Sequence, residues 1–85
     1  MSKKEKLLNQ IIQSKSDANT SFDDICNLLK KMGFIERIRG SHHIFRKDGI
    51  IEKINLQRDG VHVKAYQVRQ VRDIILKYNL GGKII

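Results

Sequence analysis

The spacing of apolar residues changes at Gly33, and this change limits the chain to a mixed fold of helices and strands. Before Gly33, apolar residues recur at the three- and four-residue spacing of a helix face, at Ile25, Leu28, Leu29 and Met32. After it, short runs rich in Ile and Phe alternate with polar residues, as strands do. Ser21 and Asp24 suit the start of the helix, and Gly33 suits its end. The pattern predicts a helix followed directly by a sheet.

Three strands are predicted after Gly33, in the segments FIERIR, HHIFRK and IIEKINL. Gly40-Ser41 indicates a tight reversal between the first two strands, and Asp48-Gly49 is a strong signal for a two-residue hairpin before the third. Turns this short connect antiparallel neighbours. The next segment, QRDGVHVK at residues 57–64, is predicted to be a polar loop.

Two more helices are predicted near the ends of the chain. Ser2 and Glu5 fit a capping box that opens a helix from about Lys3 to Ser14. Its apolar face consists of Leu7, Leu8, Ile11 and Ile12. Residues 14–21, SKSDANTS, are polar without periodicity and predict a linker or hinge. The last helix is expected from about Ala65 to Tyr78, with Gly81-Gly82 ending it. Its inner face is Val68, Val71, Ile74 and Ile75.

The predicted order α-α-β-β-β-α belongs to the α+β class, a three-stranded antiparallel sheet with helices on one face. Residues 1–20 are expected to form a helical extension and linker, and residues 21–85 the domain itself. The first helix is expected to dock on its own chain, because a domain this small gains from added apolar burial. The other face of the sheet stays open for a ligand. The largest core residues are expected to be Phe22, Phe34, Phe45 and Tyr66.

The balance of charge predicts a polyanionic partner. Lys and Arg number 17 against 9 Asp and Glu, for a net charge of +8 at pH 7. Nucleic acid is the commonest polyanion, although an anionic membrane or an acidic protein would answer the same charge. No stretch approaches the roughly 20 apolar residues of a membrane span, and no signal-peptide core is present. Cys26 is the single cysteine, which fits a reducing cytoplasm and a small core residue.

Basic residues decorate the predicted sheet and the last helix. Those on the sheet are Arg37, Arg39, Arg46, Lys47 and Lys53, and those on or beside the helix are Lys64, Arg69 and Arg72. With positive residues in such excess, a phosphate-binding face is at least as good an interpretation as an ordinary solvated surface. No aromatic ladder suited to stacking bases is present, which favours recognition of RNA backbone and shape.

Two adjacent histidines, His42 and His43, begin the second predicted strand. Strand alternation puts them on opposite faces of the sheet, and the sequence leaves open which one faces the helices. Histidine both accepts and donates a proton near neutral pH, so either could do chemistry, or both could be ordinary structural residues. Together with His62 and Cys26 they match no closed metal-site spacing. Neither a metal nor another cofactor is therefore expected.

The segment FDDICNLLKKMGFIERIRGSHHIFRKDG, with a third strand and the helix KAYQVRQVRDIILKYNL after it, resembles the HicA (YcfA-like) family of type II toxins. The resemblance covers about residues 21–82. It implies a fold like a double-stranded-RNA-binding domain, ribonuclease activity on mRNA, and control by a cognate HicB-like antitoxin. The family motif Gly-Ser-His maps onto Gly40, Ser41 and His42, which makes His42 the implied catalytic histidine and His43 the alternative. Unlike many relatives, this chain has an N-terminal extension and no proline.

The resemblance and the residues together predict a metal-independent endoribonuclease with His42 as general acid or base. The 2′-hydroxyl of the RNA would attack the neighbouring phosphate, and Arg39, Arg46 and Lys47 would stabilise the developing charge. DNA lacks that hydroxyl and should not be cut. Two alternatives remain: a module that binds structured RNA without cutting it, and a protein that mainly docks to an acidic antitoxin.

Overall fold

The computed structural model describes residues 3–15 and 17–83. In chain order the elements are α1 (Lys3–Ile12), the 3-10 helix η1 (Asp17–Asn19), α2 (Phe22–Lys31), β1 (Ile35–Arg39), β2 (His42–Arg46), β3 (Ile54–Asp59), β4 (His62–Val63), α3 (Ala65–Lys77) and the 3-10 helix η2 (Leu80–Lys83). None of the helices in this part of the chain is long and apolar enough to cross a bilayer.

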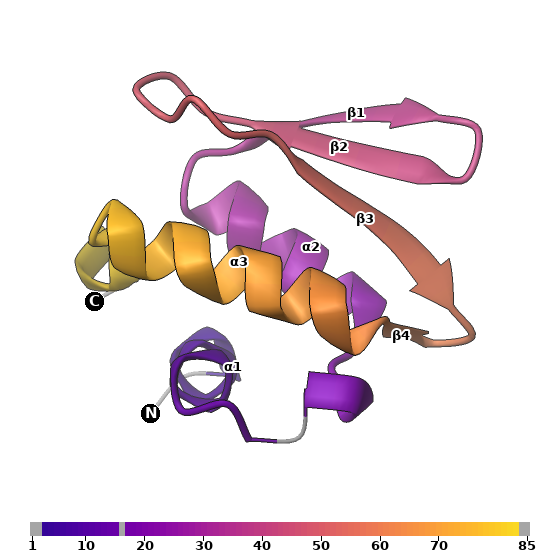
Figure 1. The fold of residues 1–85 in the computed structure, drawn as a ribbon, viewed down its shortest axis with the longest axis horizontal. Helices are drawn as coiled ribbons and strands as arrows, with labels where there is room; N and C mark the ends of the chain where they lie inside the picture. The colour runs from indigo at the N-terminus through magenta and orange to yellow at the C-terminus, as the bar shows by residue number, and fades with distance from the viewer. Residues whose placement is uncertain (1–2, 16, 84–85) are drawn as a thin grey trace.

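The four strands form one antiparallel sheet in the order β1-β2-β3-β4. Helices α2 and α3 lie against one face of the sheet, and α1 lies beyond them on the side away from the strands (Figure 1). None of the described elements covers the other face, which we call the open face. The predicted α+β class, with helices on one face of an antiparallel sheet, is confirmed, and the sheet has one strand more than expected.

Helix α2 begins and ends as its sequence predicts. The hydroxyl of Ser21 accepts a hydrogen bond from the backbone N–H of Asp24 at 3.3 Å, which satisfies one of the free donors of the first turn. Gly33 follows the helix with a φ of +101°, in the left-handed region that favours glycine. Between these ends the inner face of α2 is buried, as its apolar spacing predicts.

The core is aliphatic with three phenylalanines, as predicted, but without Tyr66. Phe22, Phe34 and Phe45 are buried, whereas the side chain of Tyr66 is 56 % exposed. The prediction for Tyr66 was wrong because the buried face of α3 starts at Gln67 and Val68, so the preceding position points to solvent. The predicted length of α3 is confirmed. The chain turns after it at Asn79, which has a φ of +53°, and not at the two glycines.

Helix α1 packs on its own chain, as expected. Leu8 and Ile11 are buried in the same core as α2 and α3, and Leu7 and Ile12 pack against that core. The helix ends at Ile12, two residues earlier than predicted, and Ser14 takes up a left-handed φ of +59°. The proposed cap at Ser2 lies outside the described residues.

The segment after α1, predicted to be a linker or hinge, is bound to distant parts of the chain. The carbonyl of Thr20 accepts from the N–H of Val63 at 3.1 Å, and the N–H of Phe22 donates to the carbonyl of Val61 at 2.9 Å. Asp17 is also held by an ion pair from α3. The sequence did not indicate these contacts, because the partners lie some forty residues or more along the chain, where no local pattern can reveal them.

The third strand begins later than predicted. Pairing with β2 starts at Phe45 and Ile54, so residues 47–53 form a loop and not a two-residue hairpin at Asp48-Gly49. A turn does form there, since the N–H of Ile50 donates to the carbonyl of Lys47 at 3.1 Å. The chain rejoins the sheet only at Ile54, because Glu52 is bound to the end of α3.

Residues 57–64 were predicted to be a polar loop, and this is also wrong. Strand β3 continues to Asp59, and β4 pairs with it through Arg58 with Val63 and Asp59 with His62. Gly60, with a φ of +65°, makes the short turn between them. A strand of two residues carries too little alternation to be seen in a sequence.

Candidate active site on the open face of the sheet

The sheet register separates the two neighbouring histidines. His42 pairs with Arg39 on β1 and Gln57 on β3, whereas His43 is the next residue and projects to the other face. His43 lies on the helical side, edge-on to the ring of Phe22 at a centroid distance of 4.7 Å. The expectation that one histidine faces the helices and the other faces solvent is confirmed.

His43 is held in place by packing and an ion pair. Its Nδ1 lies 2.7 Å from Oε2 of Glu36, and Nζ of Lys30 lies 2.9 Å from the other oxygen of that carboxylate. Burial by itself would raise the pKa of the Glu36 carboxyl, but the hydrogen bonds from His43 and Lys30 outweigh it and lower that pKa. The side chain of His43 is only 19 % exposed, so this imidazole is enclosed within the structure.

His42 is exposed on the open face and fixed through one ring nitrogen. Its Nδ1 lies 3.2 Å from Oδ1 of Asn55, on the adjacent strand β3. A carbonyl oxygen only accepts hydrogen bonds, so Nδ1 carries the hydrogen and the lone pair of the neutral ring sits on Nε2. Strand alternation places Asn55 between the buried Ile54 and Leu56 and so on the same face as His42.

The turn before His42 is built from the two motif residues. Gly40 has a φ of +58°, which the tight turn between Arg39 and His42 requires. The hydroxyl of Ser41 accepts a hydrogen bond from Nε2 of Gln57 at 3.1 Å, and this ties the turn to β3. Gly40 and Ser41 therefore fix where β2 begins, and with it the position of His42.

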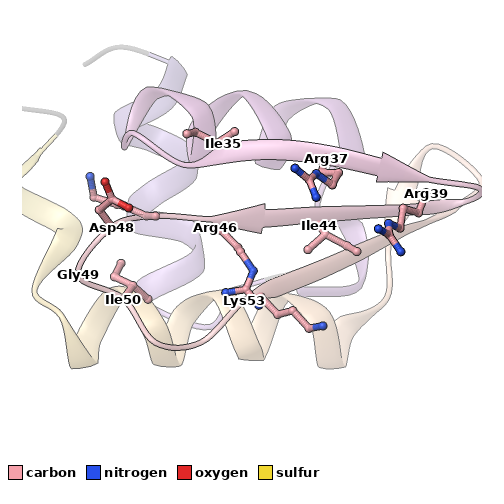
Figure 2. Close-up of a pocket in the computed structure, with 10 residues that line it drawn as sticks. Ile35, Arg37, Arg39, Ile44, Arg46, Asp48, Gly49, Ile50 and Lys53 are labelled. Carbon is pink, nitrogen blue, oxygen red and sulfur yellow. The ribbon is translucent and has the colours of Figure 1, made fainter.

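The open face also carries a shallow pocket rich in cations, which we call the basic pocket (Figure 2). Its volume is about 640 Å³. Its cationic residues are Arg37, Arg39, Arg46, Lys47 and Lys53, and its remaining residues are Ile35, Ile44, Asp48, Gly49 and Ile50. The structure thus brings together all five basic residues that the sequence placed on the sheet.

One comparison decides the family. A family model described as the HicA toxin of bacterial toxin–antitoxin systems matches residues 22–77, from the first residue of α2 to the last residue of α3. The chain belongs to the HicA toxin family. No match was found among curated proteins or among solved structures. As a HicA protein it is the toxin of a type II toxin–antitoxin system, a family that in general cleaves mRNA and is paired with an antitoxin.

Two of the basic residues predicted to bind RNA in this HicA chain, Arg69 and Arg72, lie away from the open face. Arg72 was predicted to bind RNA, but its Nη2 lies 2.6 Å from both carboxylate oxygens of Asp17, and its Nε donates to the carbonyl of Ile11 at 2.6 Å. Its side chain is only 12 % exposed, so it holds α1 and η1 to α3. Arg69 is exposed, but it projects from α3, which covers the opposite face of the sheet.

The sequence does not indicate the contacts of Glu52 with Lys77 and Tyr78, which we call the loop clamp. Oε2 of Glu52 lies 2.7 Å from Nζ of Lys77, and its Oε1 accepts a hydrogen bond from the Tyr78 hydroxyl at 2.6 Å. The hydrogen bond from Lys77, followed by that from Tyr78, lowers the pKa of Glu52 to about 2. This clamp positions the loop that contributes Lys47 and Lys53 to the pocket. No local signal indicates it, because its partners lie 25 and 26 residues apart in the chain.

Asn55 and the isoleucines of the pocket were also missed. Strand alternation would have found Asn55, which lies between two core residues and so must face the other way. Within the residues the structure describes, no three His, Cys, Asp or Glu side chains are grouped as metal ligands. Cys26 is buried, as expected, and this burial, with the nearby Glu36 carboxylate, raises the pKa of its thiol to about 12.

Proposed function

We propose that this HicA-family toxin cleaves mRNA without a metal ion, and that His42 is its proton-transfer residue. The observation that carries the proposal is the position of His42: it is exposed on the open face, at the end of β2 next to Arg39, on the face that holds the basic pocket. RNA attracted to those cations passes directly over its imidazole. A cognate HicB-like antitoxin is the protein partner that we propose for the toxin.

In the proposed reaction the RNA supplies its own nucleophile. Nε2 of His42 accepts the proton of a ribose 2′-hydroxyl, whose oxygen then attacks the adjacent phosphorus. The P–O bond to the next nucleotide breaks, and its 5′-oxygen takes up a proton from a general acid or from water. The products are a 2′,3′-cyclic phosphate and a 5′-hydroxyl. The guanidinium of Arg39 stabilises the negative charge that builds up on the phosphate.

His42 is a better candidate than His43 for physical reasons. A general base must come within about 3 Å of the proton that it removes. The imidazole of His43 is packed edge-on to Phe22, and its Nδ1 is engaged by Glu36, on the face of the sheet that the helices cover. RNA would have to displace α2 to reach it. His42 needs no such rearrangement, and Asn55 already orients its ring.

The test is the cleavage rate of His42→Ala on a purified mRNA transcript in the presence of a chelator. Because general acid–base catalysis contributes about 10²–10⁴-fold, we expect a loss of that size with little change in RNA affinity. The matched control is His62→Ala, a histidine on β4. That variant should cleave like the wild type, and a DNA strand of the same sequence should stay intact.

Three outcomes would count against this proposal. If the wild type binds the transcript and yields no fragments, the protein is a binding module. If His42→Ala cleaves normally while His43→Gln, with an unchanged melting temperature, does not, the catalytic residue is His43. If cleavage stops when metal is removed, the metal-free mechanism is wrong.

A further inference from the structure

The basic pocket contains more apolar surface than phosphate binding requires. Ile35, on the edge strand β1, is 74 % exposed there, and Ile44 and Ile50 line the same hollow. Phosphates are bound by cations and N–H groups, and an exposed isoleucine contributes nothing to them. A pocket that combines apolar side chains with cations therefore suits a ligand that is both anionic and partly apolar.

A nucleotide has this combination of properties, since its base has flat apolar faces and its phosphate is charged. Figure 2 shows Arg37 and Arg39 on β1, Ile44 and Arg46 on β2, and Lys53 before β3 along one face. Five cations and a single carboxylate, Asp48, line the pocket. Its volume of about 640 Å³ falls in the range of about 300–1,000 Å³ in which small ligands bind.

We propose that the basic pocket is a binding subsite for an unpaired RNA nucleotide, separate from the point of cleavage. The base packs on Ile35 and Ile44, and Arg46 and Lys53 hold the flanking phosphates. This inference rests on the proposed function, because it assigns the RNA a path along β2 from His42 toward the loop at residues 47–53. Ile35 pairs with Arg46, which lies four strand residues, about 13 Å, along β2 from His42, so a base packed on Ile35 belongs to a different nucleotide from the one at His42.

The base has to be unpaired to reach the isoleucines. In a duplex the faces of the bases are stacked on one another, and an A-form helix presents phosphates and 2′-hydroxyls to a protein surface. A flat sheet face with exposed aliphatic groups is therefore used only when a base is turned out of a stack. Its charge favours RNA over an apolar protein segment, which would leave five cations without counter-charges.

The test compares Ile35→Thr with Ile38→Thr in binding to a 2′-O-methyl oligonucleotide. Both residues are exposed on β1, but Ile38 lies on the opposite face from the pocket, so the pair is matched for strand, residue type and exposure. The 2′-O-methyl group removes the attacking hydroxyl, so affinity is measured without cleavage. We expect Ile35→Thr to weaken binding about three- to tenfold, and Ile38→Thr to leave it unchanged.

Two further probes identify the bound group. An abasic strand should bind the wild type more weakly than the intact strand, and this difference should shrink in Ile35→Thr, because the two changes remove the same contact. A duplex of the same sequence should bind more weakly than the single strand. Lys53→Gln should reduce the slope of log affinity against log salt by about 0.7, the value for one phosphate of a single strand.

The proposal is overturned if Ile35→Thr and Ile38→Thr bind alike, or if the duplex binds as well as the single strand. It is also overturned if Ile35→Thr weakens binding to the antitoxin but not to RNA, since the pocket would then be a protein-docking surface. The binding experiment and the cleavage experiment are independent. If the protein shows the expected binding pattern but cuts no transcript, the subsite is supported and the proposed function is wrong.

Discussion

At the scale of single residues, Asn55 links His42 to the rest of the sheet. Its side-chain oxygen holds Nδ1 of the imidazole, and its own strand is anchored by the buried neighbours Ile54 and Leu56. We expect Asn55 to be a positioning residue that keeps Nε2 directed at the substrate. Interactions of this kind commonly set both the orientation and the protonation of a histidine.

Replacing Asn55 with Asp should change the pH dependence of cleavage. A carboxylate beside the imidazole stabilises its protonated form, so a base would become available only at higher pH. The midpoint of the pH–rate profile is therefore expected to move up, while the affinity for a 2′-O-methyl strand falls slightly from the added negative charge. The measurement is a profile of single-turnover cleavage rates. Asn55→Ala is the control, and it should lower the cleavage rate without moving the midpoint of the profile upward. If the midpoint does not move in Asn55→Asp, Asn55 does not position His42.

At the scale of elements, the loop between β2 and β3 couples the pocket to the end of α3. It contributes Lys47, Ile50 and Lys53 to the open face, and Glu52 binds it to Lys77 and Tyr78 on the other side. The loop therefore depends on a charged clamp for its position and not on strand pairing.

The clamp predicts a specific loss of stability in acid. Glu52 has a folded pKa of about 2, below its ordinary value of 4.5. A depressed carboxyl pKa contributes stability that is fully present above pH 4.5 and is lost as the pH falls toward about 2. In Glu52→Gln, thermal unfolding should depend less on pH in this window. The control is Asp48→Asn, because Asp48 is an exposed acid on the same loop, and this variant should melt like the wild type at every pH. If the melting temperatures of Glu52→Gln and the wild type depend equally on pH, the loop clamp does not contribute to stability.

Elements set by local pattern were predictable, and those set by distant partners were not. Helix α2 has its cap, its apolar stripe and its terminal glycine within a dozen residues. In the segment before β3, by contrast, Ile50, Ile54 and Leu56 fit one alternating face, and Glu52 is the one exception, so the apolar residues alone do not show that residues 50–53 leave the sheet. The contact of Glu52 with α3 decides that boundary.

The candidate site follows the same rule. The sequence placed Arg37, Arg39 and Arg46 on the predicted strands, and the structure brings them to one face, because a strand fixes which face each side chain takes. Strand alternation also put the two histidines on opposite faces of the sheet. Which histidine faces the helices could not be predicted, because it depends on which face the helices cover. The contact of Arg72 with Asp17 could not be predicted, because a polar residue on a helix looks the same in the sequence whether it faces solvent or an acid 55 residues away.

At the scale of the whole molecule, the helices within residues 3–15 and 17–83 lie on one side of the sheet, and α1 adds to the core on that side. It lies outside the segment that matches the HicA family, yet its residues Leu8 and Ile11 are part of the single core. The link between Arg72 and Asp17 closes this layer at a place remote from the open face.

Breaking that link should affect stability and not RNA binding. Arg72→Met leaves the carboxylate of Asp17 and the carbonyl of Ile11 without their donor, and we expect the free energy of unfolding to fall by about 1–3 kcal/mol. For a chain of this size each kcal/mol corresponds to roughly 4–8 °C in melting temperature. Arg69→Met, an exposed neighbour on the same helix, should change the free energy by less than about 0.5 kcal/mol.

The same variants test the original assignment of Arg72 to RNA binding. Affinity for a 2′-O-methyl strand should be the same in Arg72→Met and the wild type at a temperature where both are folded. A weaker affinity without any loss of stability would mean that Arg72 leaves Asp17 to contact RNA.

The turn at Gly40-Ser41 has a consequence for how such a toxin can evolve. Because neighbouring side chains on a strand alternate, the length of that turn decides which face of the sheet each of the two histidines takes. One inserted amino acid there would exchange the faces of the two histidines, and it would turn Phe45 toward solvent and Arg46 toward the core. The length of this turn is therefore under tighter constraint than its composition. In the family, substitutions in the turn should be far more common than insertions or deletions.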